Sequence, residues 1–176
     1  MPLLDRSRSL LLVIDFQERL MPVIDEGQAA VSNAARLIKG GRLLDVPILR
    51  TEQNPRGLGP TLPELAGNEP VIEKMSFDAC PAPGFEEALS GREQIVLSGC
   101  EAHICVAQTA LGLRARGREV YVVRDAVGSR RPESKETALN RLAANGIEIV
   151  TTEMVLFEWM GTSADPQFKP VSALIK

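Results

Sequence analysis

Short runs of consecutive apolar residues alternate along the chain with longer stretches in which apolar side chains recur every three or four positions. Continuous short runs are typical of strands covered on both faces, and the longer spacing is typical of amphipathic helices. The pattern predicts six strands, at 9–14, 46–51, 70–73, 94–97, 119–124 and 147–150. The predicted helices lie at 28–45, 85–89, 102–117, 132–145 and 151–159.

Regular alternation of strands and helices is typical of a doubly wound α/β fold. We therefore expect a mostly parallel six-stranded sheet, in the order 3-2-1-4-5-6, with helices on both faces. The 176 residues are enough for one buried core, and no linker or internal repeat interrupts them. The chain is thus expected to form a single domain over residues 1–176.

Polar residues follow several of the predicted strands at the point where each ends. Asp15 follows the first strand, Gln53 lies just past the second, Lys74 follows the third, and the turn before Cys105 follows the fourth. In open α/β sheets this edge carries the ligand, at the point where the strand order reverses. Taken singly, Asp15 also fits a helix N-cap, Lys74 a solvated charge and Cys105 a core residue. Together they predict a site.

Cys105 lies close to the start of the helix predicted after the fourth strand. Unpaired N–H groups and the helix dipole stabilise a thiolate there, so we expect a lowered pKa and a candidate nucleophile. The chain has three cysteines without a CxxC pair, which are expected to be free thiols, and one histidine, which excludes a site built from several histidine ligands.

Composition narrows the class of protein. A formal net charge of −3 gives no electrostatic footprint for nucleic acid, and no run approaches the ~18 apolar residues of a membrane span. The first residues lack the ordered regions of a signal peptide, so a cytoplasmic protein is expected.

Several motifs together resemble those of the isochorismatase-like cysteine hydrolases, over nearly the whole chain. The shared pieces are LVIDFQ at 12–17, Lys74, and GCEAHICV at 99–106. The chain is most similar to the isochorismatase domain-containing proteins and related bacterial hydrolases, through residues 51–59, 125–130 and 153–159.

The resemblance implies a catalytic triad of Asp15, Lys74 and Cys105. It also implies a cis peptide between Cys100 and Glu101, and an oxyanion hole made by the N–H groups of Glu101 and Cys105. Asp15 would act as base, Lys74 as its electrostatic partner, and Cys105 would form a thioester with a small amide or related acyl or carbamoyl compound. No metal or organic cofactor is implied.

Two departures restrict the substrate. Nicotinamidases of this superfamily carry metal-binding Asp and His residues beyond strand two, where this chain has residues 52–55 and no histidine. This argues against a metal and against nicotinamide. Isochorismate cleavage does not use a thiol, so Cys105 favours acyl chemistry.

Other residues near these motifs are candidates for a substrate pocket: Phe16, Gln53, Phe77, His103 and Arg130. His103 is also interpreted as a structural donor on the helix. Phe16 and Phe77 also fit the core, where an aromatic residue near a strand end is more often found. Arg130 is a candidate partner for a substrate carboxylate, or it simply lies near the start of the following helix. Trp159 and Phe168 suggest a homo-oligomer interface. Two alternatives to the hydrolase stay open: a reactive-thiol protein with a redox or ligand-binding role, and an idle oligomeric scaffold.

Overall fold

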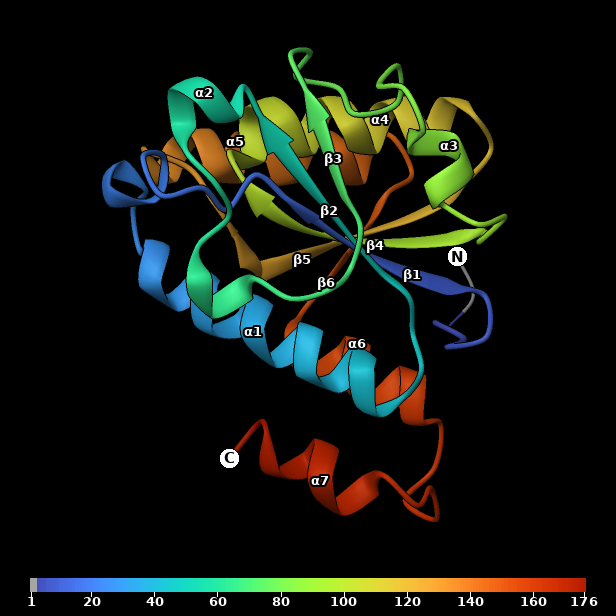
Figure 1. Cartoon of the computed structure of the whole chain (residues 1–176). Helices are drawn as coiled ribbons and strands as arrows, with labels where there is room; N and C mark the ends of the chain where they lie inside the picture. The colour runs from blue at the N-terminus through green and yellow to red at the C-terminus, as the bar shows by residue number, and fades with distance from the viewer. Residues whose placement is uncertain (1–2) are drawn as a thin grey trace.

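The computed structural model describes residues 3–176 and contains one six-stranded sheet. The strand order is β3-β2-β1-β4-β5-β6, and all neighbouring strands pair in parallel (Figure 1). The predicted α/β class and strand order are confirmed. The strands are β1 (Ser9–Ile14), β2 (Ile48–Gln53), β3 (Val71–Lys74), β4 (Gln94–Cys100), β5 (Glu119–Gly128) and β6 (Glu148–Val150).

Helices cover both faces of the sheet, with α1 and α6 on one face and α4 and α5 on the other (Figure 1). Within residues 3–176 none is long and apolar enough to cross a bilayer. The helices are α1 (Gly27–Leu43), α2 (Pro55–Leu58), α3 (Phe85–Ala88), α4 (Ala107–Ala115), α5 (Pro132–Ala144), α6 (Thr152–Met160) and α7 (Phe168–Ala173), with single helical turns η1 (Met21–Val23), η2 (Pro63–Leu65) and η3 (Ala102–Val106).

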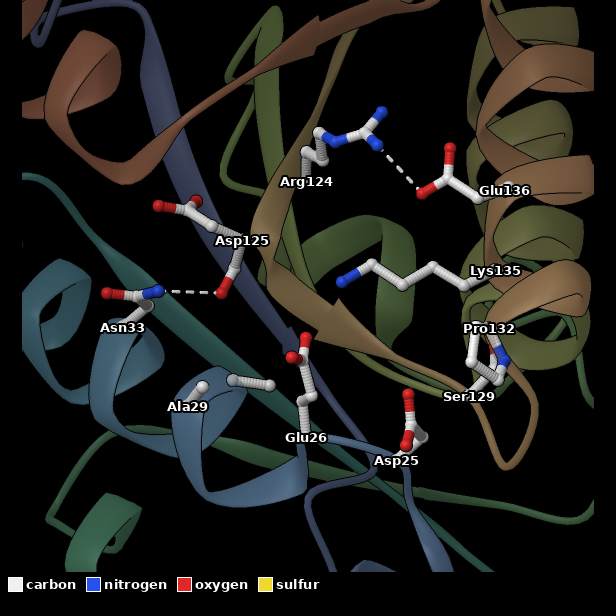
Figure 2. Close-up of a pocket in the computed structure, with 11 residues that line it drawn as sticks. Asp25, Glu26, Ala29, Asn33, Arg124, Asp125, Ser129, Pro132, Lys135 and Glu136 are labelled. Carbon is white, nitrogen blue, oxygen red and sulfur yellow. Dashed lines mark hydrogen bonds and ion pairs between the residues drawn. The ribbon is translucent and has the colours of Figure 1, made fainter.

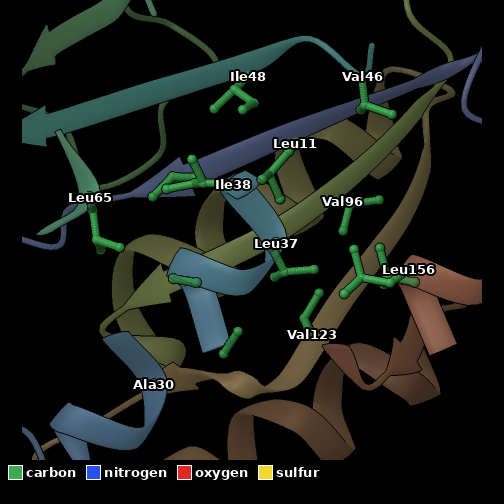
Figure 3. Packing of buried hydrophobic residues seen from close by; sticks show 14 of the residues in the cluster. Leu11, Ala30, Leu37, Ile38, Val46, Ile48, Leu65, Val96, Val123 and Leu156 are labelled. Atoms are coloured by element: carbon green, nitrogen blue, oxygen red, sulfur yellow. The ribbon is translucent and has the colours of Figure 1, made fainter. Parts of the chain in front are cut away.

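Every residue of β1 is buried, which explains its continuous apolar run. Leu11 and Val13 pack on the side of α1 and α6, whereas Leu10 and Leu12 pack on the side of α4 and α5. Figure 3 shows the first of these cores, where Leu11 lies with side chains of α1, β4, β5 and α6. The central strand therefore has no solvent face, and its carboxyl end opens directly onto polar residues.

The fourth and fifth strands are longer than predicted: β4 runs to Cys100 and β5 to Gly128, whereas the sequence pattern predicts ends at residues 97 and 124. Gly99 makes this extension possible. Its φ is 146°, and a Cβ at this position would overlap the carbonyl oxygen of Ile14. Because β1 and β4 approach so closely here, the turn that carries Cys105 (residues 101–106, the nucleophile turn) begins directly beside the end of β1.

The expectation that Trp159 forms a subunit interface is wrong. Its side chain is 2% exposed and belongs to the core beneath α1, so α6 uses it for packing within the chain. Phe168 is partly buried, and its ring contacts Phe157 edge-on with the centroids 6.5 Å apart. The short helices α2 and α7 were not predicted, because each lies in a Pro-containing segment with too few residues for periodicity to register.

Candidate active site

Asp15 directly follows β1 and adopts a left-handed backbone conformation, with φ at 53°. Its side chain is fully buried, and Thr51 Oγ1 donates a 2.6 Å hydrogen bond to Oδ1. No helix begins at Asp15, so the N-cap interpretation is wrong; the next helical turn starts at Met21. Aspartate tolerates this conformation better than most residues, which fits its place at the end of a buried strand.

Lys74 ends β3, two strands away from Asp15 in the sheet. Its Nζ donates a 2.7 Å hydrogen bond to Asp15 Oδ2, and both side chains have 0% of their surface exposed. The alternative of a solvated surface charge is therefore wrong. A buried charge of either sign is costly without a partner, so the two side chains hold each other in place.

Cys105 lies in the π-helical turn η3, with only 6% of its surface exposed. Burial raises the pKa of the Cys105 thiol to about 12. The negative charge of Asp15 and a hydrogen bond between the thiol and Asp15 act in the same direction, whereas Lys74 opposes them. The expected lowering of this pKa by the helix start is thus wrong, because burial and the neighbouring carboxylate outweigh it.

The peptide bond between Cys100 and Glu101 is cis. Cys100 is fully buried, and burial raises the pKa of its thiol. The Glu101 carboxylate is nearly buried and accepts two hydrogen bonds from Arg130, at 2.9 Å from the backbone N and 3.1 Å from Nε. The nucleophile turn is therefore fastened at Glu101 to the segment that follows β5.

A cavity of about 290 Å³ opens beside Cys105. Asp15 and Cys105 are buried at its base, whereas Val23 and Phe77 are 56% and 50% exposed. Of the predicted pocket residues, Gln53, Phe77 and Arg130 line this cavity. The full lining is Asp15, Arg19, Leu20, Val23, Gln53, Leu58, Phe77, Glu101, Ile104, Cys105 and Arg130.

Two predicted pocket residues do not line this cavity. Phe16 is 1% exposed, belongs to the core on the side of α1 and α6, and does not line the cavity, so its assignment to the substrate pocket is wrong. His103 Nδ1 lies 3.0 Å from Ser129 Oγ, and His103 borders a different cavity, next to α5. His103 therefore fits its structural interpretation.

Several lining residues were not predicted, among them Arg19, Leu20 and Val23. They belong to the segment between β1 and α1, where the sequence shows no periodic pattern. The backbone N of Arg19 donates to Leu58 O at 2.9 Å, which joins this segment to α2. Ile104 also lines the cavity, and its position directly before Cys105 in the sequence could have indicated this.

A second cavity, of about 330 Å³, lies between the start of α1, β5 and α5 (Figure 2). Arg124 and Glu136 form an ion pair at 2.8 Å across it, and Asn33 donates to the backbone oxygen of Asp125. Figure 2 shows a charged lining with no thiol, and none of the predicted site residues belongs to it. The chemistry expected from the sequence is therefore concentrated at the cavity beside Cys105.

The segment at 52–55 makes hydrogen bonds within the chain. Glu52 Oε1 accepts from the backbone N and the hydroxyl of Thr61, both at 2.7 Å, and Gln53 Nε2 donates to Met75 O at 3.0 Å. Among residues 3–176, no group of three or more His, Cys, Asp or Glu side chains is arranged to hold a metal ion.

The profile of the isochorismatase domain family matches residues 9–154, a span that includes Asp15, Lys74 and Cys105. The chain belongs to the isochorismatase domain family. Among curated relatives, it is 42% identical to mouse isochorismatase domain-containing protein 2A over 173 residues, which cover 96% of this chain and 82% of that protein. It is 40% identical to the zebrafish isochorismatase domain-containing protein 2, over 98% of this chain and 89% of the relative.

Two solved structures extend this family comparison. A protein described as MAR1 ribonuclease from Caenorhabditis elegans superposes with a TM-score of 0.95 at 36% identity, covering 99% of this chain and 92% of that one. The YcaC gene product of Escherichia coli is described as an octameric hydrolase of unknown specificity. It superposes with a TM-score of 0.92 at 24% identity, covering 98% of this chain and 89% of that one. The second likeness concerns the fold alone. Isochorismatase-family membership supports a hydrolase in general.

Proposed function

We propose that this protein is a cysteine-dependent hydrolase of a small amide or a related acyl or carbamoyl compound. The observation that carries the proposal is the fully buried Lys74–Asp15 ion pair, whose carboxylate lines the same small cavity as the Cys105 thiol and raises the pKa of that thiol. A nucleophile, a base and a group that orients the base are the parts that nucleophilic acyl transfer needs.

The resting thiol keeps its proton because its pKa is raised to about 12. Asp15 therefore acts as general base when the substrate carbonyl arrives, taking the thiol proton while the sulfur–carbon bond forms. The carbonyl oxygen then carries negative charge, and the N–H groups of Glu101 and Cys105 act as its oxyanion hole. Lys74 stabilises the negative charges that pass between Asp15 and the sulfur.

Collapse of the tetrahedral intermediate breaks the carbon–nitrogen bond, and Asp15 returns the proton to the leaving nitrogen. Ammonia or an amine departs, and the acyl group stays on Cys105 as a thioester. Water then attacks the thioester while Asp15 takes a proton from it. The carbon–sulfur bond breaks, the acid leaves, and Asp15 returns the proton to the Cys105 sulfur, which restores the thiol. The proposed steps use no metal and no organic cofactor.

RNA cleavage is the second candidate, because the nematode relative is called a ribonuclease. We favour acyl chemistry for this chain, since the cavity is small and places a thiol beside a carboxylate. A formal net charge of −3 gives little attraction to a polyphosphate backbone. The redox-thiol alternative is disfavoured by the same raised pKa, because thiol oxidation starts from the thiolate.

We further propose that residues 1–176 act as one catalytic domain in the cytoplasm and that copies of the chain associate. Met154 and Phe157 support association, since both are more than 40% exposed on α6. The octameric E. coli relative points the same way. Light scattering of the purified protein measures the number of subunits.

The test is a panel of small primary amides and carbamoyl compounds, with ammonia release and the intact mass of the protein followed together. We expect turnover and an acyl adduct on Cys105, both lost in Cys105→Ala and retained in Cys80→Ala, which removes a half-buried thiol outside the cavity. A structured RNA in the same assay tests the second candidate. Full activity in Cys105→Ala would falsify the thioester mechanism, and a panel without turnover or adduct would reject the hydrolase.

A further inference from the structure

Four of the charged groups in and around the catalytic cavity neutralise one another in pairs. Lys74 is bound to Asp15 at the base, and Arg130 is bound to Glu101 at the side. Each pair contributes one positive and one negative charge, so neither gives the cavity a net charge. Arg130, a candidate from the sequence for binding a substrate carboxylate, already has Glu101 as its carboxylate partner.

Arg19 is the remaining cation of the lining. Its Nη1 donates to two backbone oxygens of α2, Gly57 O at 3.0 Å and Arg56 O at 3.4 Å. Among residues 3–176 the guanidinium forms no ion pair. The cavity lining therefore includes one cation that forms no ion pair within the described chain, and its two hydrogen bonds use Nη1 alone.

Arg19 is exposed, whereas Asp15 and Cys105 are buried at the base of the cavity. The cation thus lies toward the opening, and the reacting atoms lie at the closed end. Leu20, Val23 and Leu58 line the same cavity, so a ligand at Arg19 contacts apolar surface as well as the guanidinium.

We propose that Arg19 binds an anionic group of the substrate, so that the substrate class is a small amide carrying a carboxylate at the end remote from the scissile bond. This inference rests on the proposed function, because it places the amide at Cys105. The guanidinium presents a fixed fork of donors that matches a carboxylate, and such charge-assisted hydrogen bonds are among the strongest available to a protein. Arg19 is thus a specificity-determining residue.

The test compares two ligands of equal length, succinamate and butyramide, which differ in a carboxylate against a methyl group. Each is used to protect Cys105 from alkylation by iodoacetamide, followed by mass spectrometry of the full-length protein. This measurement reports binding and does not require turnover. We expect succinamate to protect at a concentration about tenfold or more below that of butyramide, from the strength of a charge-assisted contact.

In Arg19→Gln this preference should fall by about tenfold, and Arg19→Lys should keep part of it because the charge remains. Arg56→Gln is the matched control: it removes the same charge from the adjacent turn, but the Arg56 side chain does not line the cavity. The control should keep the full preference.

Equal protection by the two ligands, no protection by succinamate, or an unchanged preference in Arg19→Gln overturns the assignment of Arg19. Ammonia release from the amide panel tests the proposed hydrolase separately. A wild-type protein that hydrolyses butyramide but does not distinguish succinamate therefore rejects the anionic substrate while the hydrolase stands.

Discussion

Lys74 Nζ lies 2.7 Å from Asp15 Oδ2, with both side chains fully buried, although their strands are separated by β2. The intervening strand takes part in the contact, because Thr51 of β2 donates to the other carboxylate oxygen at 2.6 Å. Residues of β2 and β3 thus hold the carboxylate that follows β1. Such an arrangement fixes the direction in which the base faces Cys105, and it makes the fold and the chemistry depend on the same contacts.

The first prediction concerns the buried ion pair. Lys74→Met should lower the free energy of unfolding by about 3–5 kcal/mol, because it leaves the Asp15 carboxylate buried without its counter-charge. Urea denaturation measures this change. Lys169→Met, at an exposed position on α7, is the control and should change stability by less than about 0.5 kcal/mol. Equal small effects of the two substitutions would show that the buried pair contributes little.

The second prediction concerns the hydrogen bond that Thr51 of β2 donates to Asp15. Thr51→Val keeps the shape of the side chain but removes the donor to Asp15 Oδ1, so a buried carboxylate oxygen loses its partner. We expect a loss of about 1–3 kcal/mol in unfolding free energy, together with a lower kcat for the preferred amide. Thr137→Val, on the exposed side of α5, serves as the comparison. A variant at Thr51 with unaltered stability and kcat would exclude a role for this hydrogen bond.

The sheet and the three strand-end residues could be predicted from the sequence because their signals are local. Six apolar runs separated by helical segments leave few possible topologies, and parallel strands end at a common edge. Asp15, Lys74 and Cys105 each lie at such an end, so the strand order alone brings them to one edge.

The side-chain directions of Phe16 and Arg19 could not be predicted from strand order. The two residues lie close together in sequence, yet Phe16 enters the core and Arg19 reaches the cavity. Their directions depend on the left-handed backbone at Asp15, with φ at 53°, which redirects the chain after β1. Hydrophobic periodicity carries no information about such a turn. The pKa of Cys105 was predicted in the wrong direction for a related reason: burial and the approach of Asp15 arise only from tertiary packing.

The third prediction concerns the close approach of β1 and β4. Gly99→Ala places a Cβ against the carbonyl oxygen of Ile14 at a φ of 146°, so backbone must move. We expect the loss of unfolding free energy to exceed about 3 kcal/mol, well above an ordinary substitution. Gly91→Ala is the comparison, because its φ is also positive at 69° but nothing lies within 4 Å of the added Cβ. Only the modest cost of a left-handed alanine, about 1–2 kcal/mol, is expected there.

The last prediction separates the reactivity of the thiol from catalysis. Asp15→Asn removes a negative charge and a hydrogen-bond acceptor that both raise the pKa of Cys105, while the lowering effect of Lys74 remains. The pKa of the thiol should therefore fall from about 12, so that at pH 8 a larger fraction is thiolate and iodoacetamide alkylates Cys105 faster than in the wild type. Amide hydrolysis should nevertheless fall by about 100-fold or more, because asparagine cannot accept the proton.

The pH dependence of alkylation provides the decisive readout. In the wild type, the rate at Cys105 should rise about tenfold per pH unit between pH 7 and 10, since the thiol stays mainly protonated below its pKa of about 12. In Asp15→Asn the rise should level off at a lower pH. Cys80, whose pKa is raised to about 12 chiefly by burial, reports in the same protein whether the substitution acts locally. If alkylation of Cys105 slows, Asp15 does not raise the pKa of the thiol; if Asp15→Asn hydrolyses the amide at the wild-type rate, the assignment of Asp15 as the base fails.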